Sequence, residues 1–324
     1  MQFSQELEES LRYLNSDAAL KSLKSDPYWP KWNSTWWQML VLHEMGLSKE
    51  IPKSVVSAYI DAINQMPLKI FPIQSDEIPE GVDPYRGIPC HCQLGNVYQV
   101  LAEHRVDVDQ KIPWLRPWFL RYQMADGGLS CDSEAYRVQG EVPSSMVGTI
   151  AVFEAVLLHT NRPWTDDERN LIAKGAEFLL GRKLMLGSST EYNAEERADE
   201  SEWLKLCFPR LYFYDVLRGL NAILLWAEKT KSWIPVESVE GVVRYLDTRF
   251  PEGLIRNERQ AYRGTGTILQ SSSGEWLRKQ PATFFPLLQS VSRMDEVSPF
   301  LTQQWSEAKR RLKSHDHLRG LLNP

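Results

Sequence analysis

The stretch LHEMGLSKEIP at residues 42–52 returns at residues 101–113 as LAEHRVDVDQKIP, with a small insertion. In both places an apolar segment precedes it, and an amphipathic segment with apolar residues at helical spacing follows it. An internal repeat of this kind indicates a supersecondary unit that is used more than once. We therefore predict that the fold is built from helical hairpins.

Three further pairs of segments continue the alternation of apolar and amphipathic sequence. They are residues 144–160 with 165–184, 208–228 with 235–250, and 283–293 with 298–312. The first segment of each pair is apolar on nearly all sides, which predicts burial, and the second keeps a charged face toward water. Strand-like alternation is scarce, so the sequence predicts an all-α protein of five or so hairpins.

Helix start signals support these boundaries. Ser34 and Ser144 lie where a side-chain oxygen would cap a helix, and Pro52 and Pro286 suit a first helical turn. We expect residues 1–324 to form a single domain, with a helix within residues 1–25 packing on the hairpins. The acidic segment 187–202 is predicted to be a solvated loop inside that domain.

Composition excludes several classes of function. The net charge is −5 and the Lys and Arg residues are scattered, which argues against a nucleic-acid partner. The first residues lack the basic start and apolar run of an export signal, and no apolar stretch reaches about 18 residues. We therefore expect a cytoplasmic protein without a transmembrane segment, whose oligomeric state stays open.

The segment between the second and third pairs reads YQMADGGLSCDSEAY, at residues 122–136. Its Gln123, Asp126, Gly127 and Gly128 resemble the Gln-x-x-Asp-Gly-Gly repeat of the terpenoid cyclase and protein prenyltransferase superfamily, which includes the squalene cyclases. This resemblance implies an α/α toroid of five to six hairpins, with an inner and an outer ring of helices. It also implies an enzyme that binds a small apolar or isoprenoid-type ligand in the central cavity.

Two acidic motifs of that superfamily have only weak counterparts. The nearest text to the Asp-x-Asp-Asp motif of the cyclases is Asp107-Val108-Asp109-Gln110, which we interpret as a turn and helix cap. Residues 165–168, TDDE, fit a helix N-cap with acids in the first turn better than a diphosphate site. The zinc ligands of the prenyltransferases have no counterpart at the family's spacing.

Four cysteines form the second candidate site. In a toroid the N-termini of the inner helices meet at one mouth, where we expect Cys90, Cys92, Cys131 and Cys207 to gather with His91. Thiolates and imidazole are ligands that zinc prefers, so these five residues are the predicted metal ligands. The Cys-His pair is similar to that of the lanthionine synthetase cyclases, another toroid group. The alternatives are buried, inert thiols, or a reactive thiol without metal.

Polar residues on the fourth apolar segment form the third candidate site. Asp215 and Tyr212, together with His91, are the predicted catalytic residues. The predicted substrate-binding residues are Trp36, His43, Tyr214, Arg210 and Arg218. Asp215 and Arg218 are spaced i,i+3, so the alternative is an ion pair that holds helices together.

Two glutamates complete the sequence-based predictions. Glu44 occupies the repeat position of Glu103, which indicates a carboxylate that binds backbone, and Glu154 must be paired or face a cavity. Three classes of function remain open at this point. The first is a terpenoid cyclase-like or prenyltransferase-like enzyme. The second is a zinc-thiolate enzyme or a metal-stabilised scaffold, and the third is a non-catalytic toroid that binds a protein or glycan.

Overall fold

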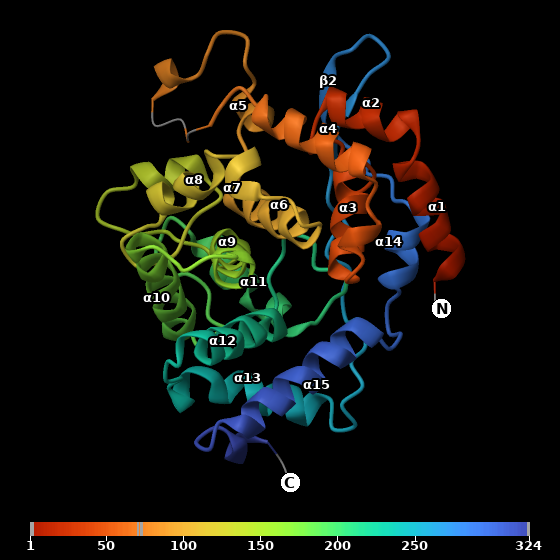
Figure 1. Ribbon diagram of the computed structural model, residues 1–324. Coiled ribbons are helices and arrows are strands. Elements are labelled where there is room, and N and C mark those ends of the chain that lie inside the picture. The colour runs from red at the N-terminus through yellow and green to blue at the C-terminus, as the bar shows by residue number, and fades with distance from the viewer. Residues whose placement is uncertain (1–2, 70, 72–73, 323–324) are drawn as a thin grey trace.

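The computed structural model describes residues 3–69, 71 and 74–322 and is mostly helical (Figure 1). The helices are α1 (Ser4–Leu14), α2 (Asp17–Ser25), α3 (Thr35–Glu44), α4 (Lys53–Asn64), α5 (Pro84–Gly87), α6 (His91–Glu103), α7 (Val108–Lys111), α8 (Leu115–Tyr122), α9 (Met146–His159), α10 (Asp166–Gly181), α11 (Ala194–Asp199), α12 (Val216–Thr230), α13 (Val236–Arg249), α14 (Pro286–Val291) and α15 (Pro299–Ser314). The predicted all-α class is confirmed.

Helices occupy both members of all five predicted pairs: α3 with α4, α6 with α8, α9 with α10, α12 with α13, and α14 with α15. The first members are the more buried, as their apolar sequences predict. In α6, 11 of 13 residues are buried, against 4 of 12 in α4. Figure 1 shows α6 and α9 toward the middle of the molecule and α4, α8, α10 and α13 toward its periphery.

Successive first helices pack against one another. The structure shows contacts of α3 with α6, of α6 with α9, and of α9 with α12, whereas α12 contacts α15, the second member of the fifth pair. The closest approach is between α6 and α9, where a Cβ atom on Gly95 would lie 2.4 Å from the backbone carbon of Ala151. Glycine at this position removes the side chain that would hold the two backbones apart. This contact brings the N-terminal half of α6 close to the segment that precedes α9.

The N-terminal region forms two helices where the sequence predicted one. α1 packs on α14 and α3, and α2 packs on α4 and α3. Ser290 of α14 donates a hydrogen bond to Glu6 of α1 at 2.9 Å, so an early segment of the chain holds a late one. The break falls at Ser16, a helix-start residue that takes the N-cap position of α2. Met1 and Gln2, part of the predicted 1–25 helix, lie outside the described residues.

Several predicted boundaries differ from the structure. α12 begins at Val216 rather than near 208, and its N-cap is Asp215. Ser145, not Ser144, caps α9, whereas Ser34 and Pro286 take the positions predicted for them. Pro52 is the N-cap residue of α4, one position before the helix.

Two further segments contain structure that the sequence did not reveal. Residues 187–202, predicted to be a solvated loop, include α11, whose Glu196 is buried and paired with Arg182. β1 (Thr267–Gln270) and β2 (Trp276–Gln280) form an antiparallel hairpin. The hairpin adjoins the helices through Thr267, which accepts a hydrogen bond from the Lys31 backbone N–H at 2.7 Å.

Candidate functional site

Three cysteines converge at the start of α6. Cys90 is the N-cap of α6, Cys92 lies in its first turn, and Cys131 lies in the loop that precedes α9. The Cys90 and Cys92 Sγ atoms are 3.1 Å apart, and the Cys92 backbone N–H donates to Cys131 Sγ at 3.3 Å. All three Sγ atoms lie within 4.8 Å of one another. The structure therefore unites residues separated by about 40 positions in the sequence.

The loop that carries Cys131 is fixed by the Asp-Gly-Gly turn. Gly127 has a φ of +90°, and a Cβ atom there would lie 2.2 Å from the backbone oxygen of Lys174. Asp126 Oδ1 accepts hydrogen bonds from the Gly128 N–H at 3.1 Å and from the Ser144 hydroxyl at 2.6 Å. Only glycine accepts both this φ and this close contact without strain. The motif thus acts here as a structural turn that positions a thiol.

His91 supports the same loop but does not face the thiol cluster. Its Nδ1 atom hydrogen-bonds to the Ser130 carbonyl at 2.6 Å, and its Nε2 atom accepts from the Trp118 indole N–H at 3.0 Å. Burial lowers the pKa of His91 to about 4, so the ring is neutral at neutral pH. Because both ring nitrogens are engaged, neither the predicted metal ligation nor the predicted catalytic role of His91 fits the structure. The side chain instead holds the residue next to Cys131.

Cys207 does not belong to the cluster. It is fully buried, and burial raises its pKa to about 12, which keeps it a neutral thiol. The charged groups that influence it are Arg259, Asp215, Arg210 and Glu44 rather than the other cysteines. The predicted four-cysteine set is therefore corrected to three, because α12 begins only at Val216 and Cys207 does not lie at its start.

The geometry of the three thiols fits a tetrahedral metal ion. With metal–sulfur bonds of about 2.3 Å, the sulfurs of such a site lie roughly 3.8 Å apart. The Cys90 and Cys92 Sγ atoms are closer than that, at 3.1 Å, and all three Sγ atoms lie within 4.8 Å of one another, so small movements of the side chains would give the spacing of such a site. The structure thus shows three close cysteines that can hold a metal ion, and three protein ligands leave one of four positions open.

The three thiols also influence one another's ionisation. Hydrogen bonds from the Cys131 and Cys92 thiols hold the pKa of Cys90 well below its usual range, although burial opposes this. Hydrogen bonds with Cys131 and then Cys90 raise the pKa of Cys92 well above its usual range, and the hydrogen bond with Cys90 raises the pKa of Cys131 in the same direction. Without a further cation, the cluster therefore favours a single thiolate shared by two thiols. Full deprotonation requires additional positive charge.

A cavity of about 570 Å³ opens over the cluster. Cys90, Cys92 and Cys131 lie in its wall. Most of its remaining wall is aromatic or aliphatic, contributed by Tyr28, Trp29, Phe71, Tyr85, Ile88 and Tyr212. Tyr212, a predicted catalytic residue, is therefore at this cavity. A ligand bound here would contact sulfur at one side and apolar rings at the others.

Asp215 lies elsewhere, in a buried ion pair. Its Oδ2 atom accepts from Arg210 Nε at 2.6 Å, and its Oδ1 atom accepts from the Arg218 backbone N–H at 2.8 Å as the N-cap of α12. The partner of the pair is thus Arg210 and not Arg218, because the helix starts one residue after Asp215. Both carboxylate oxygens are engaged, which leaves Asp215 without the free oxygen that the predicted acid–base role requires.

Arg218 and His43 line a second, smaller cavity of about 270 Å³. Arg218 is paired with Glu154 at 2.6 Å, so Glu154 is both paired and at a cavity, as the sequence predicted. His43 bonds to the Ser48 hydroxyl at 2.9 Å, and burial lowers its pKa to about 3. Most residues that line this cavity carry charged or polar side chains, whereas the resemblance implied an apolar central cavity.

Glu44 binds backbone as predicted, but in another segment than the next hairpin. Its carboxylate accepts from the backbone N–H groups of Arg210 and Leu211 at 2.7 and 2.6 Å. Burial raises its pKa to about 7, although these hydrogen bonds and the two nearby arginines oppose the shift. Glu44 therefore ties the end of α3 to the segment before α12.

Trp36 and Tyr214, two predicted substrate-binding residues, are core residues. Trp36 is 1% exposed and stacks on Tyr59 with ring centroids 4.9 Å apart. Tyr214 is fully buried and donates a hydrogen bond to the Leu184 carbonyl at 2.7 Å. Neither lines a described cavity, so their aromatic rings stabilise packing.

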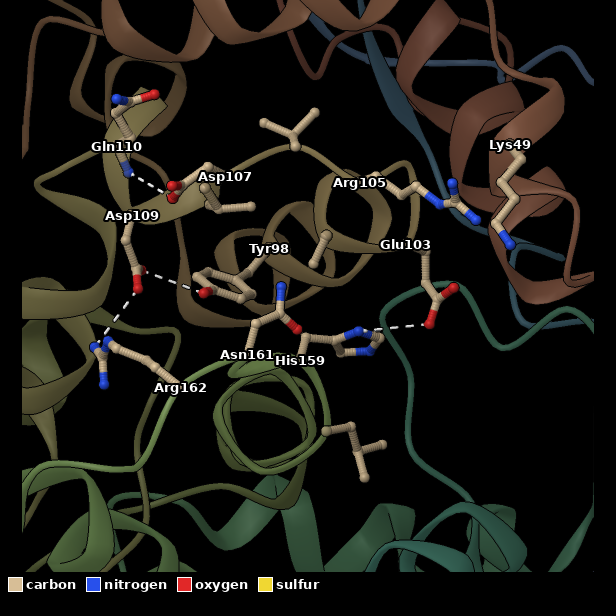
Figure 2. A pocket seen from close by; sticks show the side chains of 14 residues that line it. Lys49, Tyr98, Glu103, Arg105, Asp107, Asp109, Gln110, His159, Asn161 and Arg162 are labelled. Atoms are coloured by element: carbon tan, nitrogen blue, oxygen red, sulfur yellow. Dashed lines mark hydrogen bonds and ion pairs between the residues drawn. The ribbon is translucent and has the colours of Figure 1, made fainter.

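The acidic turn at 107–110 lies at a third cavity, of about 720 Å³ (Figure 2). Asp107 caps α7 by accepting from the Gln110 N–H at 3.1 Å, which confirms the predicted cap. Asp109 pairs with Arg116 at 2.8 Å and with Arg162 at 3.5 Å. These carboxylates are held by neighbouring groups of the protein itself, so the turn is structural.

The acidic motif at residues 165–168 and the repeat residue Glu103 are also bound by groups of the protein itself. Thr165 and Glu168 form a capping box at the start of α10, as predicted. Glu103 lies 3.6 Å from His159 at the cavity of Figure 2 and does not bind backbone as Glu44 does. The two copies of the repeat therefore share the turn, but the carboxylates of Glu44 and Glu103 have different partners.

Sequence reasoning missed Lys31, the cation of the thiol cavity. Its Nζ atom donates to Tyr212 Oη at 3.0 Å, and burial lowers its pKa while the three cysteines oppose the shift. The signal in the sequence is the segment YWPKW at residues 28–32, where a lysine stands among three aromatic residues. Gln93, in the first turn of α6, lines the same cavity and was missed as well.

Comparison with known proteins finds no matching family model, no matching curated protein and no matching solved structure. In the part of the chain that the structure describes, no helix is both long and apolar enough to cross a membrane.

Proposed function

We propose that this protein is a zinc-thiolate enzyme whose metal ion is bound by Cys90, Cys92 and Cys131 and which activates a thiol of its substrate. The observation that carries the proposal is the convergence of three thiols in the wall of a cavity large enough for a small ligand. Structural zinc sites are usually closed by four protein ligands, whereas catalytic sites keep a position open. Three ligands beside a cavity match the second kind.

The donor set indicates the kind of chemistry. Thiolates are soft ligands and favour zinc among the common metals. A bound zinc ion would hold a substrate thiol as a thiolate, which is its nucleophilic form. The chain's own residues would position the metal, exclude water through the aromatic walls, and keep Cys131 in place through His91 and the Asp-Gly-Gly turn.

The proposal includes the fold and the ligand class that the family resemblance implies. We propose that the five helix pairs form an α/α toroid, supported by the contacts in chain order of the buried helices of the first four pairs, α3, α6, α9 and α12. An apolar part of the ligand would pack against the rings of the thiol cavity. Acid–base chemistry by Asp215, as in a terpenoid cyclase, is the less supported alternative because Arg210 neutralises that carboxylate.

Metal analysis of the purified protein tests the proposal. We expect about one zinc ion per chain, and in the cobalt-loaded protein an intense sulfur-to-cobalt absorption that changes when phenylmethanethiol is added. Cys131→Ala should lose the metal and the absorption, because two thiolates hold zinc much more weakly than three.

Cys207→Ala is the matched control, since it removes a buried thiol away from the cluster. It should bind as much zinc as the unmodified chain. A protein that purifies without metal and gives no cobalt–thiolate absorption would refute the proposal, and equal metal loss in both variants would refute the assignment of the ligands.

A further inference from the structure

Lys31 presents a fixed positive charge to the thiol cavity. Four aromatic rings surround its Nζ atom, with centroids at 4.9 Å for Tyr212, 5.3 Å for Trp29, 5.6 Å for Trp32 and 5.7 Å for Tyr28. Ring faces attract a cation and hold it in place without neutralising its charge. The backbone N–H of Lys31 is tied to Thr267, which fixes the segment as well as the side chain.

Most of the hydrogen-bonding capacity of this ammonium is unused. A lysine ammonium has three N–H donors. Tyr212 Oη, at 3.0 Å, is the one acceptor that the described residues provide. The negative charge near Lys31 is the thiolate of the cysteine cluster, so the two remaining N–H donors of the ammonium are available to an incoming anion.

The other charged groups at the cavity have partners in the protein. Arg86 is paired with Asp26 at 2.7 Å, and its guanidinium lies 3.7 Å from the ring centroid of Trp276. Asp132 accepts hydrogen bonds from the Tyr192 hydroxyl and the Glu134 N–H. Among the described residues that line this cavity, Lys31 is therefore the cation without a carboxylate partner.

Gln93 lies in the same wall and offers a second donor. It is 4% exposed and lines the cavity, and its Nε2 atom lies beside the Tyr59 hydroxyl, a buried group that likewise has no other partner in the described structure. An amide nitrogen carries two N–H donors, so pairing with Tyr59 leaves one of them for a ligand.

We propose that Lys31 and Gln93 bind a carboxylate of the substrate, so that the site takes a thiol that carries a carboxylic acid on a short apolar chain. This inference rests on the proposed function, since it assigns the thiol to the open position beside Cys90, Cys92 and Cys131. A carboxylate has two oxygens and can accept from the ammonium and the amide together. The aromatic side chains around Lys31 lower the local polarity, which strengthens the charge pair.

Two small thiols, one with a carboxylate and one with the corresponding methyl ester, test the inference on the cobalt-loaded full chain. The probes are 3-mercaptopropionate and its neutral methyl ester, and the sulfur-to-cobalt absorption reports their affinities. We expect the affinity ratio of acid to ester to fall about tenfold or more in Lys31→Met, the size of effect that loss of one buried charge pair produces. Lys31→Arg, which keeps the charge, should retain most of the preference.

Two further variants keep the result decisive. Lys49→Met removes an exposed lysine outside the thiol cavity and should leave the ratio unchanged. Gln93→Leu should lower it a few-fold, and it tests the carboxylate site independently if Lys31→Met does not fold. Absence of a cobalt–thiolate absorption in the unmodified chain would refute the proposed function itself. A normal absorption, with an affinity ratio that neither Lys31→Met nor Gln93→Leu changes, would overturn only the carboxylate assignment.

Discussion

Asp215 illustrates how single ionisable residues in this protein divide between structure and chemistry. Its carboxylate is fully buried, but Arg210 and the N-terminus of α12 account for both of its oxygens. The three thiols of the metal site instead face a cavity and have mainly one another as partners. The thiols of the candidate site thus have bonding capacity left for a metal ion or ligand, whereas the carboxylates of the buried ion pairs have none.

The variant Asp215→Asn isolates the charge of this pair. Asn caps a helix as well as Asp does, so the substitution keeps the cap and removes the carboxylate charge that pairs with the buried Arg210 guanidinium. We expect a loss of about 3–5 kcal/mol in the free energy of unfolding, measured by urea denaturation. Asp107→Asn, at the exposed cap of α7, is the control and should change stability by less than about 0.5 kcal/mol. Equal effects of the two substitutions would contradict the assigned role.

His43 predicts a pH dependence of stability. Its pKa is lowered to about 3 by burial and by the nearby His159 and Arg218, whereas an unfolded histidine titrates near 6.5. A lowered pKa stabilises the fold above pH ~6.5, and this contribution is lost as the pH falls from ~6.5 toward the folded value. We expect the unfolding free energy of the unmodified chain to fall more steeply between pH 7 and pH 5 than that of His43→Gln. Parallel curves would show that His43 titrates normally.

Among the elements, the turn between α8 and α9 has the greatest consequence for the site. Gln123 Nε2 donates to the Gly127 carbonyl and to the Leu171 carbonyl of α10, both at 2.9 Å, and so joins the turn to α10. The chain then reaches Cys131 four residues later. The Gln-x-x-Asp-Gly-Gly motif, which resembles the repeat of an enzyme family, therefore stabilises a turn in this structure.

Gly127→Ala tests that role. The new Cβ would meet the Lys174 carbonyl at 2.2 Å and impose a left-handed conformation on alanine. Overpacking of about 1–3 kcal/mol and a backbone cost of roughly 1–2 kcal/mol together predict a loss of about 2–5 kcal/mol, measured by urea denaturation. In Gly140→Ala, where φ is +82° but no atom lies within 4 Å, only the backbone cost applies. If both substitutions cost the same, the close contact with α10 is not important.

The elements also show the reach of sequence-based prediction. Helices that are apolar on all sides, such as α9, were identified because such a helix is stable only in the interior of the protein. The start of α12 was misplaced because residues 208–215 are rich in apolar residues, as α12 itself is. The hydrogen bond that Asp215 accepts as the N-cap marks the true boundary. The hairpin of β1 and β2 was missed because β2 is mostly exposed and carries no alternating pattern.

For the whole molecule, the candidate site depends on how hairpins pack rather than on any one of them. α6 supplies two thiols, the loop before α9 supplies the third, and residues 28–32 before α3 supply the lysine. The tight contact of α6 with α9 at Gly95 brings two of these segments together. Sequence reasoning grouped the cysteines through an expected shared mouth, which identified three of them and wrongly included Cys207.

By itself the sequence determined the all-α class, the pairing of buried with amphipathic helices, and the caps at Asp107 and Thr165, because helix periodicity and capping are properties of neighbouring residues. Only the tertiary structure decided that His91 turns away from the thiols, that Asp215 is neutralised by Arg210, and that Lys31 faces the cysteines. The physical reason is that charge pairing and metal-ligand geometry depend on distances of a few ångströms between segments far apart in the chain. The packing of whole helices sets these distances, and local sequence does not encode them.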